Sequence, residues 1–284
     1  MTWKKMSLDE YAAYEKGNGT PLLKVGDVWW RRVRPFFYRT LFPFQTVDIG
    51  KNVPGFAFGW QHRVADTKRA NSWMNVIVFD EVAHYSLECL RRKKRSFVRK
   101  ALSRLAVEVI DDHSLFCREA HRVYCAFYDR TNYHWKRERL SKEGFDKWAD
   151  HLFKYGKVVI HGVYHHGILV AINISYLVED ILIDAAFFST NEGLRLGSSD
   201  AVWHRIREDA SCSQGIRYIY EGPVSGNQGL NESKLIRGGK ILSITSYLHM
   251  NCVLLKAIKL TKRKWYDKIA GKTDLPNHYR RITE

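Results

Sequence analysis

The pattern of apolar positions along the chain changes its period near residue 157. Upstream, apolar residues recur at helical spacings of three and four, and the first clear series is Leu87, Leu90, Phe97, Val98, Ala101, Leu102 and Leu105. Downstream, residues 157–188 read KVVIHGVY, ILVAINISYL and ILIDAAFF, three apolar runs separated by the short polar segments HHG and VED. Such runs, joined by tight turns, predict an antiparallel meander of three strands.

Other elements follow from caps and periodicity. We predict a short strand at residues 106–110 and two amphipathic helices that start after Asp112 and Ser141, whose side chains are typical N-caps. After the meander the pattern predicts a loop at STNEGLRLGSS, a helix, the strand GIRYIYEG, a short helix, the strand KILSITSYLHM and a last basic helix. This order of helices and strands predicts an α/β (α+β) fold with a mixed sheet.

The first 85 residues are rich in aromatic and basic side chains. The stretch VWWRRVRPFFYRTLFPF, residues 28–44, predicts short strands interrupted at Pro35 and Pro43. Its tryptophans and arginines could stack on nucleic-acid bases, but a strand pair with buried rings and solvated arginine heads is the commoner arrangement. We expect residues 1–85 to form a strand-rich N-terminal extension or a degenerate half-domain, and residues 86–284 to form the main domain.

Composition limits the class of protein. With 284 residues, 45% of them hydrophobic, the chain is long enough to bury a large core. The sequence has no run of eighteen apolar residues and no apolar segment of a secretory signal, so we expect a cytoplasmic protein. The five cysteines are scattered and form no C-x-x-C pair, which argues against a disulfide framework or a zinc site and favours buried thiols. His161, His165 and His166 lie on a predicted hairpin without a carboxylate at ligand spacing, so we expect no metal.

The net charge of +16 is the strongest compositional signal. It favours a polyanionic partner, which could be nucleic acid, anionic lipid, an acidic carrier protein or a phosphate-rich cofactor. The helix predicted around residues 90–105 concentrates this charge without any acidic residue, through Arg91, Arg92, Lys93, Lys94, Arg95, Arg99, Lys100 and Arg104. The candidates for binding a polyanion are Arg91, Arg92, Lys93, Arg95 and Arg99, and a merely solvated face is the alternative.

The last helix, VLLKAIKLTKRKWYDKI, has an apolar stripe of Leu254, Ile258, Trp265 and Ile269. Its lysines lie elsewhere on the helix. This pattern would suit peripheral contact with an anionic membrane, and it would equally suit a helix packed on the sheet.

The loop predicted after the meander carries candidate chemistry. Backbone N–H groups at a helix N-terminus favour anions, so a phosphate or pyrophosphate could dock at Gly193, Gly197, Ser198 and Ser199, with Arg195 closing over it. An ordinary strand-to-helix loop with Ser198 or Ser199 as its N-cap is the alternative.

The stretch GNQGLNESKLIRGGKI, residues 226–241, carries a second set of candidates. Asn227 could bond an amide of an extended ligand, and Lys234 could reach an oxyanion or a leaving group. Gly238 and Gly239 end the predicted helix, as C-cap glycines do. Without further information, Lys234 could equally be a surface lysine on a short capped helix.

From residue 87 to the C-terminus, this succession of elements resembles the GNAT superfamily of acyltransferases, and within it the FemAB-like branch. The stretches that carry the resemblance are LRRKKRSFVRKAL, DILIDAAFFSTNEGLRLGSSDAVWHRIREDA and LNESKLIRGG. The resemblance implies a GNAT-like fold with a mostly antiparallel sheet flanked by helices. It also implies an enzyme that transfers an acyl group to an amine.

The resemblance implies roles for individual residues. GNAT enzymes have an Asn, a Tyr seven residues later and a Gly four further on, and Asn227, Lys234 and Gly238 keep this spacing with Lys in the place of Tyr. In ordinary members the Asn contacts the pantetheine arm of the donor. In FemAB-like members the Lys is taken to stabilise charge at the aminoacyl ester under attack.

Two further points bear on the donor and the base. The family's pyrophosphate motif would align on Leu194, Gly197 and Ser199, where its first basic residue is missing and Arg195 could substitute from the next position. Glu221, at the end of the strand GIRYIYEG, is the nearest carboxylate before the late motif and a candidate base for the acceptor amine. A surface acid at a strand end is the alternative.

Three functions stay open on the sequence alone. The first is N-acyl transfer from an acyl thioester, carried by CoA or an acyl carrier protein, to an amine on a small molecule or peptide. The second takes aminoacyl-tRNA as the donor, with the basic helix holding phosphates. The third is a non-catalytic module that binds a polyanion.

Overall fold

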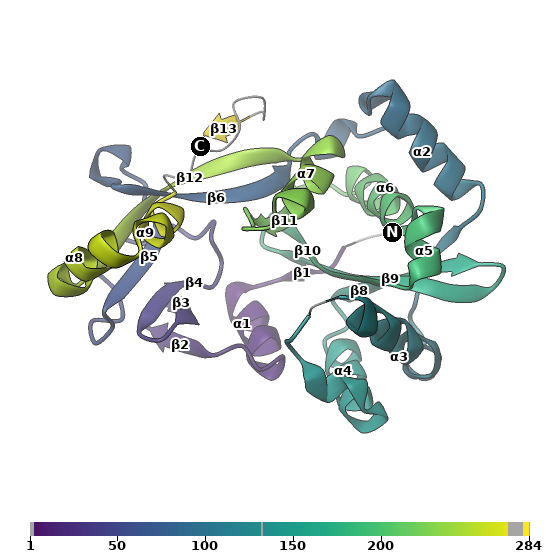
Figure 1. Ribbon diagram of the computed structural model, residues 1–284, viewed down its shortest axis with the longest axis horizontal. Helices are drawn as coiled ribbons and strands as arrows, with labels where there is room; N and C mark the ends of the chain where they lie inside the picture. The colour runs from purple at the N-terminus through teal and green to yellow at the C-terminus, as the bar shows by residue number, and fades with distance from the viewer. Residues whose placement is uncertain (1–2, 132, 272–280, 284) are drawn as a thin grey trace. The chain divides into compact units, whose positions relative to one another are not determined.

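The computed structural model describes residues 3–131, 133–271 and 281–283. The chain forms two compact units that interleave along the sequence (Figure 1). Unit 1 consists of Met1–Ser7, Phe79–Gly222 and Ile236–Gly238, and unit 2 consists of Leu8–Val78, Pro223–Leu235 and Gly239–Glu284. The sequence predicts a single boundary after residue 85. The units divide the chain differently because β12 (Lys240–Met250) pairs with strands from the first eighty residues.

In unit 1 the predicted meander is confirmed. Its strands are β8 (Val158–His165), β9 (Ile168–Val178) and β10 (Ile181–Ser189), which pair antiparallel through tight turns. β7 (Ala106–Val109) lies antiparallel beside β8, and β11 (Tyr218–Pro223) lies parallel beside β10. β1 (Lys5–Met6) adds a parallel pair at the end of β9. The sheet is therefore mixed and mostly antiparallel, as predicted.

Two helices, α3 (His113–Arg130) and α4 (Lys142–Lys154), pack together on one face of this sheet (Figure 1). Both predicted caps are confirmed, because Asp112 accepts hydrogen bonds from the N–H groups of Ser114 and Leu115, and Ser141 accepts one from Gly144. An aromatic cluster fills the space between helices and sheet, formed by Phe116, Tyr124, Phe145, Trp148 and Phe188.

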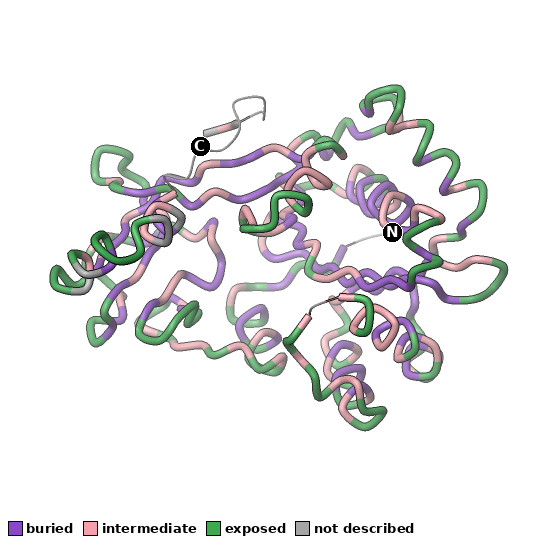
Figure 2. The backbone as a smooth tube through the Cα atoms, in the orientation of Figure 1, coloured by how far each residue is buried: buried purple, intermediate pink, exposed green. Residues whose placement is uncertain are grey.

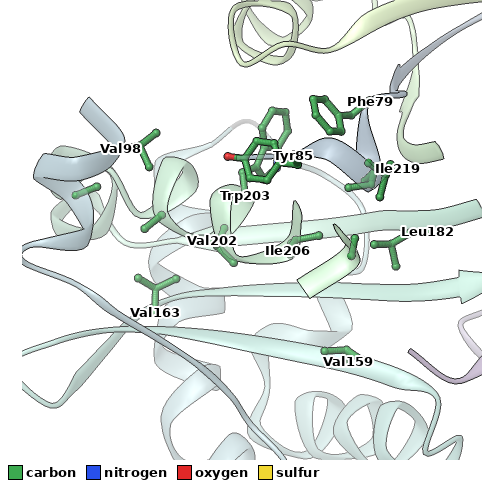
Figure 3. Close-up of a cluster of buried hydrophobic side chains, with 14 of the residues drawn as sticks. Phe79, Tyr85, Val98, Val159, Val163, Leu182, Val202, Trp203, Ile206 and Ile219 are labelled. Atoms are coloured by element: carbon green, nitrogen blue, oxygen red, sulfur yellow. The ribbon is translucent and has the colours of Figure 1, made fainter. Parts of the chain in front are cut away.

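The other face is covered by α6 (Ser198–Ser211), with α2 (Arg92–Leu102) packed against α6. The core on this side contains Val202, Trp203 and Ile206 of α6 together with Val163 of β8 and Leu182 of β10 (Figure 3). In Figure 2 most of α2 is exposed, whereas most of α6 is buried.

Two expectations about this region are corrected. The helix predicted from Leu87 is a 3-10 turn, η3 (Leu87–Cys89), followed by α2, because Leu90 and Arg91 have non-helical backbone conformations that interrupt the helix. The loop predicted at residues 189–199 contains a short helix, α5 (Asn191–Leu196), because the Thr190 side chain caps it at the Gly193 N–H. Helical turns also occur at η2 (Val82–His84) and η4 (Arg137–Leu140).

Unit 2 confirms the strand-rich N-terminal extension and adds C-terminal elements to it. Its sheet has the order β2 (Leu22–Val25), β3 (Val28–Arg34), β4 (Phe37–Thr40), β5 (Gly59–Arg63), β12 and β6 (Ser72–Phe79), with β13 (Arg281–Thr283) beside β12. Its helices are α1 (Leu8–Gly17), η1 (Thr67–Arg69), α7 (Gln228–Ile236), α8 (Cys252–Thr261) and α9 (Arg263–Ile269).

The last basic helix was predicted as one element and is corrected to two, α8 and α9. Ile258 and Ile269 are buried against Phe37 and Leu248 of the sheet, which is the packing alternative for its apolar stripe. The side chains of Leu254 and Trp265 lie outside the described residues. Within the described part of the chain, no helix is both long and apolar enough to cross a membrane.

The expectation of buried thiols is corrected as well. Cys117 is buried and Cys125 is half-buried, whereas Cys89, Cys212 and Cys252 are exposed. None of the five is joined in a disulfide. Burial, followed by a hydrogen bond to Asp146, raises the pKa of the Cys117 thiol to about 11, so this thiol is protonated and poorly nucleophilic.

Candidate functional site

Strands β10 and β11 part within unit 1. They pair in parallel only at Ile181–Tyr218, Leu182–Ile219 and Ile183–Tyr220, and beyond these pairs both strands continue without pairing to each other. At the same place β10 has a bulge between Asp184 and Ala186. Backbone groups of parting strands can bond an extended ligand, and bulges often re-aim a side chain beside a functional site.

Three polar side chains lie together at this bulge: Asn173 and Ser175 of β9 and Asp184 of β10. Asp184 is the register partner of Ser175, and Asn173 Nδ2 donates a hydrogen bond to Asp184 Oδ1 at 2.6 Å. Asn173 and Ser175 are fully buried, and within the described residues their Oδ1 and Oγ atoms have no hydrogen-bond partner. Asp184 is only half-buried. Buried polar atoms are normally bonded, so these two unmatched oxygens beside a reachable carboxylate mark a candidate site.

This group was not among the candidates predicted from the sequence. The run ILVAINISYL predicts an apolar strand, but Asn173 and Ser175 are two residues apart and therefore lie on one face of it. Two polar residues on the buried face of a central strand were the available signal. That Asp184 opposes them depends on the register of β9 and β10, which the sequence pattern does not fix.

His161 extends the polar group on the same face of the sheet. It is the register partner of Asn173 on β8, and its Nε2 lies 3.3 Å from Asp209 Oδ2 of α6. Burial alone would raise the pKa of Asp209, but hydrogen bonds from His161 and Arg205 hold it below its usual value. No group of three or more possible metal ligands occurs among the residues that the structure describes. His161 is thus tied to a carboxylate within the fold.

The N-terminus of α6 carries an ion-pair network. Asp200 Oδ1 lies 2.6 Å from Lys94 Nζ of α2 and 2.5 Å from Arg237 Nε, and Arg237 also donates to Ser199 Oγ at 2.8 Å. Burial alone would raise the pKa of Asp200, but the charge of Arg237 and the hydrogen bond from Lys94 lower it below its usual value. A negative carboxylate therefore already occupies the helix end where the sequence analysis placed a phosphate.

The remaining residues of that predicted loop are used by the fold. The Gly193 N–H bonds Thr190 Oγ1, and the Gly197 N–H bonds carbonyls at the end of α5. Ser198 is buried and its hydroxyl bonds Ser189 at 3.0 Å, whereas Arg195 is exposed. Gly197 has a φ of +88°, and a Cβ added there would lie 3.1 Å from the Cβ of Ala101 on α2. Two of the four predicted N–H donors, those of Gly193 and Gly197, are thus bonded within the fold. The Asp200 carboxylate lies at the same helix end.

Glu221 lies in a buried ion pair. Arg207 Nη2 of α6 donates to Glu221 Oε1 at 3.0 Å, and the two side chains are 4% and 1% exposed. The Arg207 guanidinium also lies over the Phe79 ring at 3.9 Å, beside Tyr85. Burial raises the pKa of Tyr85 to about 12. This environment ties Glu221 to α6, which favours a structural contribution from the carboxylate.

In unit 2, Lys234 lies on the short helix α7, and Asn227 directly precedes the first residue of that helix. Asn227 caps the helix, because its Oδ1 accepts from the Leu230 N–H at 3.3 Å. Lys234 is half-buried. The helix ends at Ile236, and Gly238 in the turn that follows has a φ of +91°, which suits glycine.

The basic face of α2 divides into two sets. Lys94 pairs with Asp200, and both Arg95 and Arg99 pair with Glu88, so nearby carboxylates compensate these three cations. Arg91, Arg92 and Lys93 are exposed at the start of the helix. The candidate polyanion-binding set therefore consists of three exposed cations and two that are paired within the fold.

No protein-family model matches the chain, and no curated protein sequence matches it either. Solved structures do match. FemX is similar over 88% of this chain and 93% of its own, with 13% identity and a TM-score of 0.60. L-PGS from Bacillus licheniformis is similar over 95% of this chain and 99% of its own, with 12% identity and a TM-score of 0.56.

A third similar structure is the C-terminal domain of a predicted lysylphosphatidylglycerol synthetase from Agrobacterium fabrum. It is similar over 89% of this chain and 90% of its own, with 11% identity and a TM-score of 0.57. At these identities the likeness is one of fold. The chain has a GNAT-like fold of the FemAB type, in agreement with the resemblance found in the sequence.

Proposed function

We propose that this protein transfers an aminoacyl group from aminoacyl-tRNA to an amine. The observation that carries the proposal is the parting of β10 and β11 beside the half-buried Asp184 carboxylate, which Asn173 holds in place. The fold supports it, since similar structures include FemX and a lysylphosphatidylglycerol synthetase domain. The proposal goes further than the fold, because fold alone does not determine function.

The choice of donor rests on the N-terminus of α6. A CoA thioester would need a place for its pyrophosphate, and Asp200 with its two cations occupies the place that the sequence suggested. An aminoacyl ester carries no pyrophosphate. Its tRNA phosphates could be met by the exposed Arg91, Arg92 and Lys93 of α2. A thioester on CoA or on an acyl carrier protein is the alternative donor.

The proposed chemistry is aminolysis of an ester. The nitrogen of the acceptor amine forms a bond to the ester carbonyl carbon, and the amine proton passes to the Asp184 carboxylate. The C–O bond of the ester then breaks, and the ribose oxygen leaves and takes up a proton. For Lys234 the resemblance to FemAB-like enzymes implies a role in opposing negative charge at the ester, and for Asn227 it implies a contact with the donor. Glu221, held by Arg207, is the alternative proton acceptor.

The test is a single-turnover assay with tRNA charged with a labelled amino acid and a panel of amines. Lys234→Met keeps most of the aliphatic part of the side chain and removes the charge. We therefore expect ~100- to 1,000-fold slower transfer by a variant that still folds. Lys154→Met, which removes an exposed lysine of α4, is the matched control and should keep the wild-type rate. Near-wild-type rates for Lys234→Met would contradict its role.

The role of Asp184 is tested separately. Asp184→Asn still accepts the hydrogen bond from Asn173 but cannot take up a proton, so we expect ~100-fold or greater loss in rate. Glu221→Gln is the comparison, and a larger loss of rate in that variant would identify Glu221 as the proton acceptor. Activity with acyl thioesters and none with aminoacyl-tRNA would contradict the proposed donor. Binding of tRNA without turnover of any donor would make the protein a polyanion-binding module.

A further inference from the structure

Unit 2 carries exposed phenylalanines at the turn between β3 and β4 and in the segment before β5. Phe36, Phe56 and Phe58, here called the aromatic tip, are 53%, 64% and 49% exposed. The Phe36 and Phe58 rings lie 5.0 Å apart between centroids, and Phe56 contacts Tyr38 at 5.8 Å. Large apolar side chains that gather in solvent usually mark an interaction surface.

The fold holds Phe36 outward. Its φ is +57°, a left-handed value that is uncommon for a bulky residue, and the strain persists because neighbouring contacts fix the turn. The Phe36 carbonyl accepts from the Gly59 N–H at 3.2 Å, which joins the turn to the segment that carries Phe58. Phe37, the next residue, is buried against Met250 and Ile258. The chain therefore buries one phenylalanine and presents its neighbour to solvent.

Two valines extend the apolar surface around the tip. Val33, near the end of β3, is 41% exposed. Val253, at the start of α8, is 72% exposed and belongs to the same end of unit 2, because the Asn251 N–H bonds the Phe58 carbonyl at 2.7 Å. Exposed apolar side chains therefore occur on the β3–β4 hairpin, on the segment before β5 and on the first turn of α8.

Cations flank this surface. Arg31, Arg32 and Arg34 are exposed on the outer half of β3, and Lys256 and Lys259 are exposed on α8. Among the described residues, none of the three arginines takes part in an ion pair. Exposed apolar side chains accompanied by arginines and lysines are complementary to a surface with an apolar interior and negatively charged groups at its interface with water.

We propose that the aromatic tip docks unit 2 on an anionic lipid surface. The rings would enter the boundary between headgroups and acyl chains, and the arginines would meet lipid phosphates. A lipid surface fits better than RNA, because Val33 and Val253 offer no flat ring for a base and the Phe36 and Phe58 rings contact each other. The proposal does not depend on the transferase function.

The test is co-sedimentation of the full chain with phosphatidylcholine vesicles, with and without phosphatidylglycerol. The variant Phe36→Asn with Phe58→Ser removes two rings, and Asn tolerates the left-handed backbone at residue 36. We expect binding to phosphatidylglycerol vesicles to weaken at least about 10-fold, because each buried ring contributes a strongly favourable transfer term. Arg32→Gln with Arg34→Gln should weaken it about 30-fold, and high salt should act like this second variant.

The matched control is Phe97→Ser. Phe97 is a phenylalanine on α2 with the same exposed fraction, 53%, among basic residues but outside the tip. Its loss should leave vesicle binding unchanged. Equal losses for the control and the tip variant, or no loss for either, would overturn the proposal. Tip-dependent binding of a single-stranded RNA oligonucleotide, with no binding to vesicles, would also overturn it. Thermal melting of each variant separates these outcomes from unfolding.

Discussion

Helices α2 and α6 of unit 1 pack against each other, and both are rich in charged residues. They differ in how far these charged side chains are buried and paired. Along α6, Arg207 and Asp209 are buried, and each has an ionic partner from the sheet or its own helix. Along α2, Arg91, Arg92 and Lys93 are exposed to solvent. The comparison shows that charge density in the sequence does not reveal which charged side chains are paired within the fold and which are exposed to solvent.

The contrast also bears on stability. A buried ion pair costs desolvation, and removing one member leaves the other as an uncompensated buried charge. An exposed cation is solvated with or without a partner, so its removal has little effect on folding. Mutations in α6 should therefore act on the free energy of unfolding, whereas mutations on the exposed face of α2 should act on binding alone.

The largest effect is expected for Arg207→Met, which leaves the buried Glu221 carboxyl without the cation of its ion pair. We expect the free energy of unfolding to fall by about 3 to 5 kcal/mol, measured by urea unfolding at neutral pH. Adding Glu221→Gln to this variant should recover part of the loss. Arg92→Met on α2 is the control and should change stability by less than about 0.5 kcal/mol. Similar losses for Arg207→Met and Arg92→Met would contradict the comparison.

A smaller effect is expected for Asp200→Asn, which links the two helices. The side chain is 14% exposed and pairs with Lys94 and Arg237, so losing its charge should cost about 1 to 3 kcal/mol. The same change leaves two cations at the N-terminus of α6 without their carboxylate. We therefore expect the variant, but not the wild type, to gain stability from added inorganic phosphate in a thermal melt. No phosphate effect would show that this helix end does not bind anions even when its carboxylate charge is removed.

The smallest effect concerns pH. Burial lowers the pKa of His204, and the charge of Glu208 opposes that shift only in part. As the pH falls below about 6.5, the unfolded chain takes up a proton at this position that the folded chain resists, so stability falls as well, by at most about 1.4 kcal/mol per pH unit. Above that pH both states are neutral there and the contribution is constant.

Urea unfolding of wild type and His204→Gln between about pH 7.5 and pH 5.5 measures this contribution. Glutamine can still bond the Tyr85 hydroxyl, which lies 3.0 Å from His204 Nδ1. Burial also lowers the pKa values of His62 and His249 of unit 2. Both residues are present in wild type and variant, so their contributions cancel in the difference between the two proteins. The variant should therefore lose less stability than the wild type on acidification. Identical pH profiles would mean that His204 carries no such penalty.

The candidate functional residues also fall into two groups, those predicted from the sequence and those identified only in the structure. Asn227, Lys234 and the basic residues of α2 were predicted from motif spacing and charge, because both are properties of nearby residues. Asp184 was not predicted as a candidate, since its neighbours Asn173 and Ser175 come from another strand. Asp200 and Arg237 were missed for the same reason, because their pairing joins residues 37 positions apart.

The sequence by itself determined the local elements: the meander, the Asp112 and Ser141 caps and the basic character of α2. Hydrophobic period and capping act over a few residues, so they can be seen in consecutive positions. The tertiary structure alone decided that the last helix is two and that β12 pairs with strands from the first eighty residues. It also decided which cations have carboxylate partners and which phenylalanines are exposed. These outcomes depend on contacts between distant residues, whose burial and pairing set the energy of each group.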